Sequence, residues 1–126
     1  MPICPIGPNV SAPPPPPPAP GPKHACTLTA QLGCFDDTKA GSVLPAAQPQ
    51  VHDIVTQGNC ASACFDANLS IAGIDAGNHC WCGKSLVAGG ALKRPAAECQ
   101  ASTCHGNHTE KCGGTDRLMA YSFACE

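Results

Sequence analysis

Cysteine is the residue type of this chain with the clearest capacity for chemistry, with eleven cysteines among 126 residues. This density is typical of small secreted domains whose cores are held by disulfides. The competing use of clustered cysteines is a zinc site, and histidines adjoin two of them, at His79-Cys80 and Cys104-His105. Zinc binding requires free thiolates, which an oxidising compartment removes. We therefore interpret the cysteines as disulfide partners and expect no metal and no cofactor.

Glycosylation signals support the same compartment. Three Asn-x-Ser/Thr sequons begin at Asn9, Asn68 and Asn107, and each is a candidate N-glycosylation site. A proline run adds candidate sites for hydroxylation and O-glycosylation, namely Pro13, Pro14, Pro15, Pro16, Pro17 and Pro18. We expect an extracellular or cell-surface glycoprotein, and we take this sequence as a mature chain or fragment whose leader is not shown.

Catalytic groups are not recognisable in the sequence. The cysteines are committed to disulfides, and Glu98, Glu110 and Asp116 fit solvated surface charges. Asp36-Asp37 fits an acidic turn in water better than a calcium or sugar contact. The small net charge of -2 argues against a nucleic-acid partner, and no apolar run is long enough for a membrane span. We predict that the chain is not an enzyme.

The elements that must position the cysteines follow from spacing and capping signals. Strands are expected at 28–35 and 117–123, and a hairpin at 71–74 and 79–83 around a turn-rich loop. A short helix is expected at 57–67, with Thr56 as N-cap and Asn68 as stop, and 86–97 fits a loop. The predicted fold class is α+β.

This helix and hairpin suggest two parallel disulfides. Cys60 and Cys64 are four apart and share one helix face, while Cys80 and Cys82 are two apart and share one strand face. A helix lying on the strand then pairs Cys60 with Cys80 and Cys64 with Cys82.

The remaining cysteines of the domain are assigned by proximity. Cys104 and Cys112 are close enough to close a small loop, which leaves Cys34 and Cys99 as a pair. Cys26 and Cys125 flank the domain, where termini commonly lie close together, and we pair them. The alternative pairs Cys4 with Cys125 and leaves Cys26 over.

Trp81 is the candidate centre of a ligand site. If Cys80 and Cys82 face inward, Trp81 faces the opposite side of the strand. An aromatic ring beside hydrogen-bonding groups is a common way to hold a sugar, and Asp75, Asn78 and His79 are the candidate polar partners. The alternative is that the loop 84–98 covers Trp81, which then belongs to a core that is poor in aromatic residues.

Residues 1–24 differ from residues 25–126 and are predicted to be a separate arm. They hold eleven of the fourteen prolines, so polyproline II structure is expected, either as a stiff spacer or docked against a neighbour. With the other ten cysteines paired, Cys4 is the odd cysteine, a candidate for an intermolecular bond.

The ordered motifs resemble a WSC domain over about residues 28–123: Leu32-Gly33-Cys34-Phe35, Cys60-x3-Cys64, Cys80-Trp81-Cys82-Gly83, Glu98-Cys99-x4-Cys104 and Cys112-Gly113-Gly114. The resemblance implies a PAN-like fold with four internal disulfides and an extracellular module associated with carbohydrate. Two functions fit this resemblance. One is a structural subunit of an extracellular fibre or wall that assembles through its arm and associates with glycans, and the other is a monomeric carbohydrate-binding module on a stiff stalk.

Overall fold

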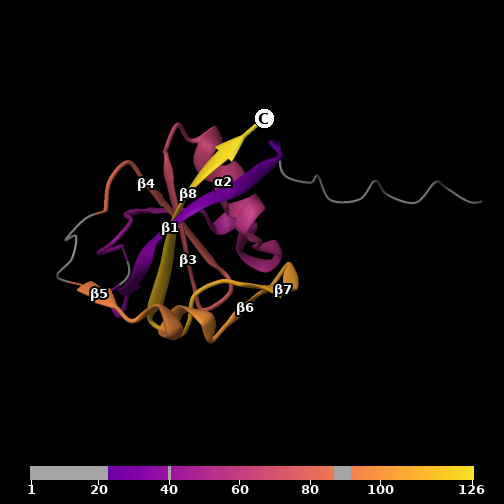
Figure 1. The fold of residues 1–126 in the computed structure, drawn as a ribbon. Coiled ribbons are helices and arrows are strands. Elements are labelled where there is room, and N and C mark those ends of the chain that lie inside the picture. Colours follow the sequence, from indigo (N-terminus) through magenta and orange to yellow (C-terminus); the bar gives the residue numbers. More distant parts are fainter. Residues whose placement is uncertain (1–22, 40, 87–91) are drawn as a thin grey trace, which may run out of the picture.

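The computed structural model describes residues 23–39, 41–86 and 92–126, which form an α+β unit (Figure 1). Cys4, Asn9 and the proline run of the predicted arm lie outside the described residues. The strands are β1 (Cys26–Asp36), β2 (Ala46–Ala47), β3 (Ile71–Asp75), β4 (His79–Gly83), β5 (Lys93–Arg94), β6 (Thr103–Cys104), β7 (Asn107–Lys111) and β8 (Arg117–Cys125). The helical segments are the α-helix α2 (Gln57–Asp66) and the 3₁₀ helices η2 (Pro49–Ile54) and η4 (Ala96–Gln100).

Six strands form one antiparallel sheet in the order β2-β4-β3-β8-β1-β5. Its longest pairing runs from Cys26 opposite Cys125 to Asp36 opposite Arg117. This pairing brings the two ends of the described domain side by side. The four predicted strands are all in this sheet, and three of them extend beyond their predicted bounds by one to three residues.

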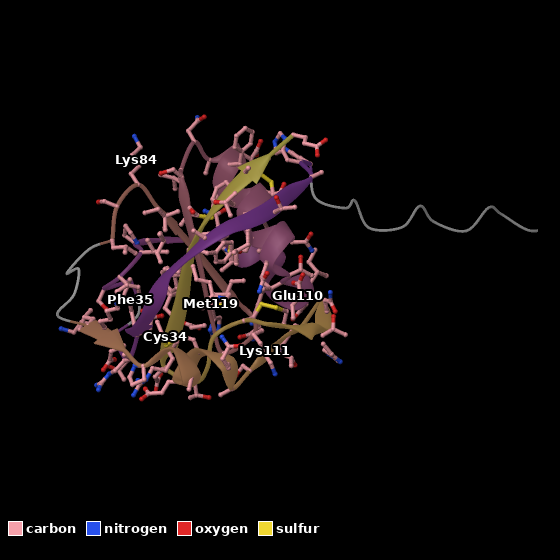
Figure 2. All side chains as sticks on the ribbon, in the orientation of Figure 1. Cys34, Phe35, Lys84, Glu110, Lys111 and Met119 are labelled. Atoms are coloured by element: carbon pink, nitrogen blue, oxygen red, sulfur yellow. A yellow bond between two sulfur atoms is a disulfide. The ribbon has the colours of Figure 1, made fainter. Side chains whose placement is uncertain are left out.

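Helix α2 packs on one face of the sheet, against β1, β3, β4 and β8 (Figure 1). The Thr56 hydroxyl accepts the Asn59 N–H at 2.9 Å, which is the N-cap that the sequence predicts. The Glu110 carboxylate, labelled in Figure 2, accepts the Gln57 N–H at 3.0 Å and satisfies a further donor of the first turn. The helix ends before Asn68, whose φ of 63° stops it as expected.

Five disulfides hold the domain together, and they are the five pairs that the sequence analysis proposes: Cys26–Cys125, Cys34–Cys99, Cys60–Cys80, Cys64–Cys82 and Cys104–Cys112. Two of them join α2 to β4, as helix and strand periodicity requires. A third, Cys26–Cys125, joins the first residue of β1 to the last residue of β8, so the two ends of the described domain are linked covalently.

The sheet separates two apolar clusters. The face toward α2 carries Cys34, Ile74, Met119 and Tyr121, packed around the disulfides. The opposite face carries a smaller cluster, which includes Phe35, Val43, Leu44 and Leu118. The adjacent residues Cys34 and Phe35, both labelled in Figure 2, therefore belong to different clusters, as alternation along β1 dictates.

Residues 92–114 contain more regular structure than the sequence indicates. Within the predicted loop, β5 pairs with β1 through Cys34 opposite Arg94, and η4 then places Cys99 for its disulfide. The Cys104–Cys112 disulfide closes the β6–β7 hairpin. Two-residue strands such as β5 carry too little periodicity to be predicted from sequence.

Candidate ligand-binding site

A pocket of about 250 Å³ opens beside the β3–β4 turn, where β4 meets β2 and η2. It is lined by Ala47, Gln48, Pro49, His52, Asn78, His79, Cys80 and Trp81. Three of the four predicted site residues, Asn78, His79 and Trp81, thus share one cavity. The fourth, Asp75, does not line the cavity and is buried next to it, where its carboxylate contacts His79.

The turn that presents Asn78 and His79 has a fixed backbone. Ala76 and Gly77 have φ values of 53° and 81°, and the Asn78 N–H donates to the Asp75 carbonyl at 3.2 Å. These are the signs of a tight hairpin turn with two left-handed central residues. Gly77 also donates to the Cys112 carbonyl at 3.0 Å and accepts from the His105 N–H at 2.9 Å. The disulfide-closed β6–β7 hairpin therefore supports the turn from behind.

His79 is oriented by a buried carboxylate. Its Nδ1 lies 2.7 Å from Asp75 Oδ1, and the side chain of Asp75 is 10% exposed while that of His79 is 52% exposed. A carboxylate accepts hydrogen bonds, so Nδ1 carries the proton and Nε2 is left for a ligand. The ring of His79 is thus held in one orientation and one tautomer.

His52 completes the polar side of the pocket. Its ring stacks on that of His79 with centroids 5.1 Å apart, and its Nε2 lies 2.5 Å from Asn78 Nδ2. Helix η2 is held in place by a backbone hydrogen bond from Gln48 to the Cys80 carbonyl at 2.9 Å and by the buried side chain of Val51. The two imidazoles and one amide offer both donors and acceptors within a small space.

Trp81 contributes to the core and to the pocket. It faces away from the disulfides, as strand alternation predicts, and pairs with Ala47 of β2. It is half-buried against the second apolar cluster, and Gly41 lies over its ring. Part of the indole lines the cavity. The segment that includes Gly41 and Ala47 therefore covers part of Trp81. The sequence alone suggests only residues 84–98 for this role.

Asp75 shares its buried surroundings with Asp37. Asp37 is 5% exposed, and its Oδ2 has no hydrogen-bond donor among the described residues. Burial, a hydrogen bond to Asp75 and repulsion from the Asp75 carboxylate raise the pKa of Asp37 to about 8. Burial also raises the pKa of Asp75, against the opposing effect of the neighbouring Asp37 and Trp81 side chains. The folded domain therefore favours a proton shared between Asp37 and Asp75.

The indole N–H of Trp81 belongs to the same buried polar group. Trp81 Nε1 is buried and forms no well-aligned hydrogen bond among the described residues. It is nevertheless close enough to Asp75 to lower the pKa of that carboxyl.

The prediction of a solvent-exposed acidic turn at Asp36-Asp37 is wrong for Asp37. The Asp37 N–H donates to the Asp116 carbonyl at 2.9 Å, and the side chain is buried beside Asp75. Asp36 stays at the surface, where the Thr38 N–H and Arg94, at 2.9 Å, lower its pKa. Adjacent carboxylates on a strand end face opposite ways, so one of the two is turned inward.

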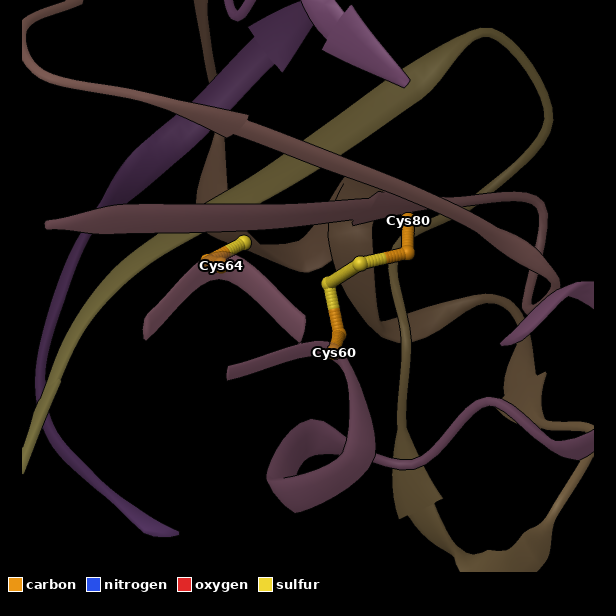
Figure 3. Close-up of side chains that lie close together, drawn as sticks. All are labelled: Cys60, Cys64 and Cys80. Atoms are coloured by element: carbon orange, nitrogen blue, oxygen red, sulfur yellow. A yellow bond between two sulfur atoms is a disulfide. The ribbon is translucent and has the colours of Figure 1, made fainter. Parts of the chain in front are cut away.

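A further sulfur cluster carries no metal chemistry. Sulfur atoms of Cys60, Cys64 and Cys80 lie within 4.8 Å of one another (Figure 3). Each belongs to a disulfide, and a disulfide sulfur is not a thiolate ligand. The same holds for Cys104 beside His105.

Sequence reasoning missed His52, Gln48 and Asp37. His52 and Gln48 come from a segment whose sequence has no link to the hairpin, and only the β2–β4 pairing brings them there. The burial of Asp37 beside Asp75 depends on the β1–β8–β3 strand order, which places the ends of β1 and β3 on either side of β8. That order could not be predicted from the sequence.

Comparison with known proteins identifies the family. The WSC domain family model matches residues 31–114. A WSC domain-containing protein of Arthroderma benhamiae is 38% identical over 103 residues, which cover 79% of this chain and 11% of that protein. Kremen protein 1 of Xenopus laevis is 30% identical over 97 residues, covering 77% of this chain and 21% of that protein. A putative fungistatic metabolite of Chaetomium globosum is 31% identical over 98 residues, which cover 77% of this chain and 43% of that protein.

This chain thus spans about a fifth of Kremen protein 1 and about a tenth of the Arthroderma protein. Within the described residues, no helix has the length and apolar character needed to cross a bilayer. The matched segment contains eight of the ten cysteines that form disulfides, together with Trp81 and the pocket. The chain belongs to the WSC domain family.

Proposed function

We propose that the described domain is an extracellular, non-enzymatic module that associates with carbohydrate and holds a sugar residue in the pocket beside the β3–β4 turn. Family membership and five disulfides support an extracellular module. The chemistry of the pocket supports a polar, ring-shaped ligand.

The convergence of His52, Asn78 and His79 beside Trp81 is the observation that carries the proposal. A sugar presents hydroxyl groups around its ring and C–H groups on its faces. Two imidazoles and an amide can hydrogen-bond the hydroxyls, while the indole packs against the ring. Since Asp75 fixes the His79 ring and the turn fixes Asn78, little side-chain entropy is lost on binding.

Binding to immobilised polysaccharides and soluble oligosaccharides tests the proposal. His52→Ala and Asn78→Ala should each weaken binding about tenfold, which corresponds to about 1.4 kcal/mol. His108→Ala is the matched control, because it removes an exposed histidine on β7, away from the pocket. Equal affinity of the H52A and H108A variants would contradict the site.

Trp81→Ala separates the two roles of the indole. It should weaken binding while all five disulfides still form, as shown by mass spectrometry without reduction. A variant that fails to form its disulfides would assign Trp81 to the core, and the stacking part of the proposal would be wrong.

A second candidate function is assembly into an extracellular fibre or wall through the Pro-rich arm. The five disulfides use all ten cysteines of the described residues, and Cys4 is the one cysteine outside them. A disulfide from Cys4 would therefore link the chain to another molecule. Non-reducing electrophoresis should show a covalent dimer or larger species that Cys4→Ser abolishes. A wild-type chain that remains monomeric at high concentration would rule this function out.

A further inference from the structure

The end of α2 places a sequon at the rim of an apolar groove. Asn68, Leu69 and Ser70 form the sequon, and all three line a groove of about 380 Å³ together with Phe65 and Phe123. Asn68 is exposed, and its left-handed backbone is fixed by hydrogen bonds from the Asn68 N–H to Phe65 and from the Leu69 N–H to Cys64. The attachment atom for an N-glycan therefore has a defined position beside the groove.

Phe65 is more exposed than its size would suggest. It is 45% exposed and, with Ile54, is one of two large apolar side chains exposed among the described residues. One side of its ring meets the His24 ring edge-on, with centroids 4.8 Å apart. Phe123 of β8 is half-buried on the other side of the groove. Two phenyl rings next to a sequon form an apolar surface that is suited to the C–H face of a sugar.

We propose that Asn68 is N-glycosylated and that the first N-acetylglucosamine residues of its glycan lie in this groove, on Phe65 and Phe123. The glycan is tethered at the groove itself, so its local concentration there is high and weak ring contacts are sufficient for docking. An N-glycosidic bond forms between Asn68 Nδ2 and C1 of the first sugar, while the bond from that C1 to the diphosphate of a lipid-linked oligosaccharide donor breaks and the amide loses one proton. The docked glycan covers the exposed ring of Phe65 and thereby stabilises the end of α2. This inference is independent of the ligand pocket.

Glycosylation alone would not have this effect at every sequon. Asn107 is also a candidate, but its Oδ1 accepts hydrogen bonds from the Thr109 N–H at 3.0 Å and the Thr109 hydroxyl at 2.6 Å, within β7. Of the two exposed large apolar side chains among the described residues, the aromatic one, Phe65, lies beside Asn68, whereas the backbone next to Asn107 adjoins Ile54. Asn107 therefore serves as an internal control for a glycan without an aromatic groove.

The test uses the full chain expressed in a eukaryotic secretory host. Peptide mass spectrometry should find a glycan on Asn68, and thermal unfolding should compare the wild type with Ser70→Ala, which removes the sequon and keeps Asn68. The glycan should raise the Tm by about 4–8 °C. Phe65→Ala should abolish most of this difference, and Phe65→Tyr, which keeps the ring, should retain it. Thr109→Ala should change the Tm equally with and without Phe65.

Two results would overturn the proposal. One is an unmodified Asn68, and the other is an equal effect of Ser70→Ala in the wild-type and F65A backgrounds. NMR of the chain with isotope-labelled sugars should show contacts between sugar protons and the Phe65 ring. Contacts of that ring with proline protons instead would mean that the arm occupies the groove, and the proposal would be wrong.

Discussion

Replacing Asp37 with asparagine should make the domain more stable at pH 8 and remove most of the pH dependence of its stability between about pH 4 and 8. The asparagine side chain has nearly the same shape as that of Asp37, carries no charge and can donate an amide N–H to the Asp75 carboxylate. The substitution thus keeps the hydrogen bond and removes the need for a proton.

The direction in which stability changes with pH follows from proton binding. The pKa of Asp37 is raised from 3.8 to about 8 in the folded domain, so the folded state binds more protons than the unfolded state between these values. Stability is then highest below about pH 4 and is lost as the pH rises toward 8. Each unit of pKa difference corresponds to about 1.4 kcal/mol. Since Asp37 and Asp75 share the proton, we expect the free energy of unfolding to fall by about 2–3 kcal/mol. This is less than the value obtained by multiplying the whole pKa difference by about 1.4 kcal/mol.

Denaturant unfolding with the disulfides intact measures this effect. Fluorescence of Trp81, the one tryptophan of the chain, can report unfolding from pH 4 to pH 9. Asp37→Asn should match the wild type at pH 4 and exceed it by about 2 kcal/mol at pH 8. Asp53→Asn, at an exposed carboxylate that is not among the groups acting on Asp37 or Asp75, is the control and should leave the slope unchanged. A D37N variant that is less stable than the wild type at pH 8 would refute the proton-sharing pair.

Two further outcomes follow from the disulfides and from Tyr121. Removing Cys34–Cys99, which spans 65 residues, should cost about 4 kcal/mol, whereas removing Cys104–Cys112, which spans 8, should cost about 2.5 kcal/mol. Denaturation midpoints of the two double-alanine variants check this, and a reversed order would contradict the loop-closure account. Burial raises the pKa of the Tyr121 phenol well above 10, and its hydroxyl donates to the Gln57 carbonyl at 2.6 Å. The chain has one tyrosine, so absorbance titration should show no phenolate near pH 10 until the domain unfolds, and ordinary titration there would contradict its burial.

Local spacing was sufficient to predict the frame of the fold. Cys60-x3-Cys64 and Cys80-x-Cys82 fix which faces of a helix and a strand meet, so they predict both the elements and the contact between them. Thr56 and Asn68 mark the helix ends through chemistry that acts within a few residues. For these reasons the main helix, four strands and five disulfides could be predicted before the structure.

The pocket could be predicted only in part, because its far side depends on long-range pairing. Asn78, His79 and Trp81 are neighbours in sequence and share one cavity. His52 reaches the same cavity through β2 and η2, two short elements without a recognisable pattern. Asp37 is buried because the ends of β1 and β3 lie close together, which no local signal reveals.

NMR of the isotope-labelled full chain, titrated with soluble oligosaccharides of glucose, mannose and N-acetylglucosamine, tests the carbohydrate site most directly. The account predicts that at least one sugar series shifts the signals of His52, Asn78, His79 and the Trp81 indole N–H together, with smaller shifts elsewhere. The β6–β7 hairpin carries His105 and His108 outside the pocket and serves as an internal reference. Shifts confined to other surfaces, or none with any sugar, would contradict the proposed site.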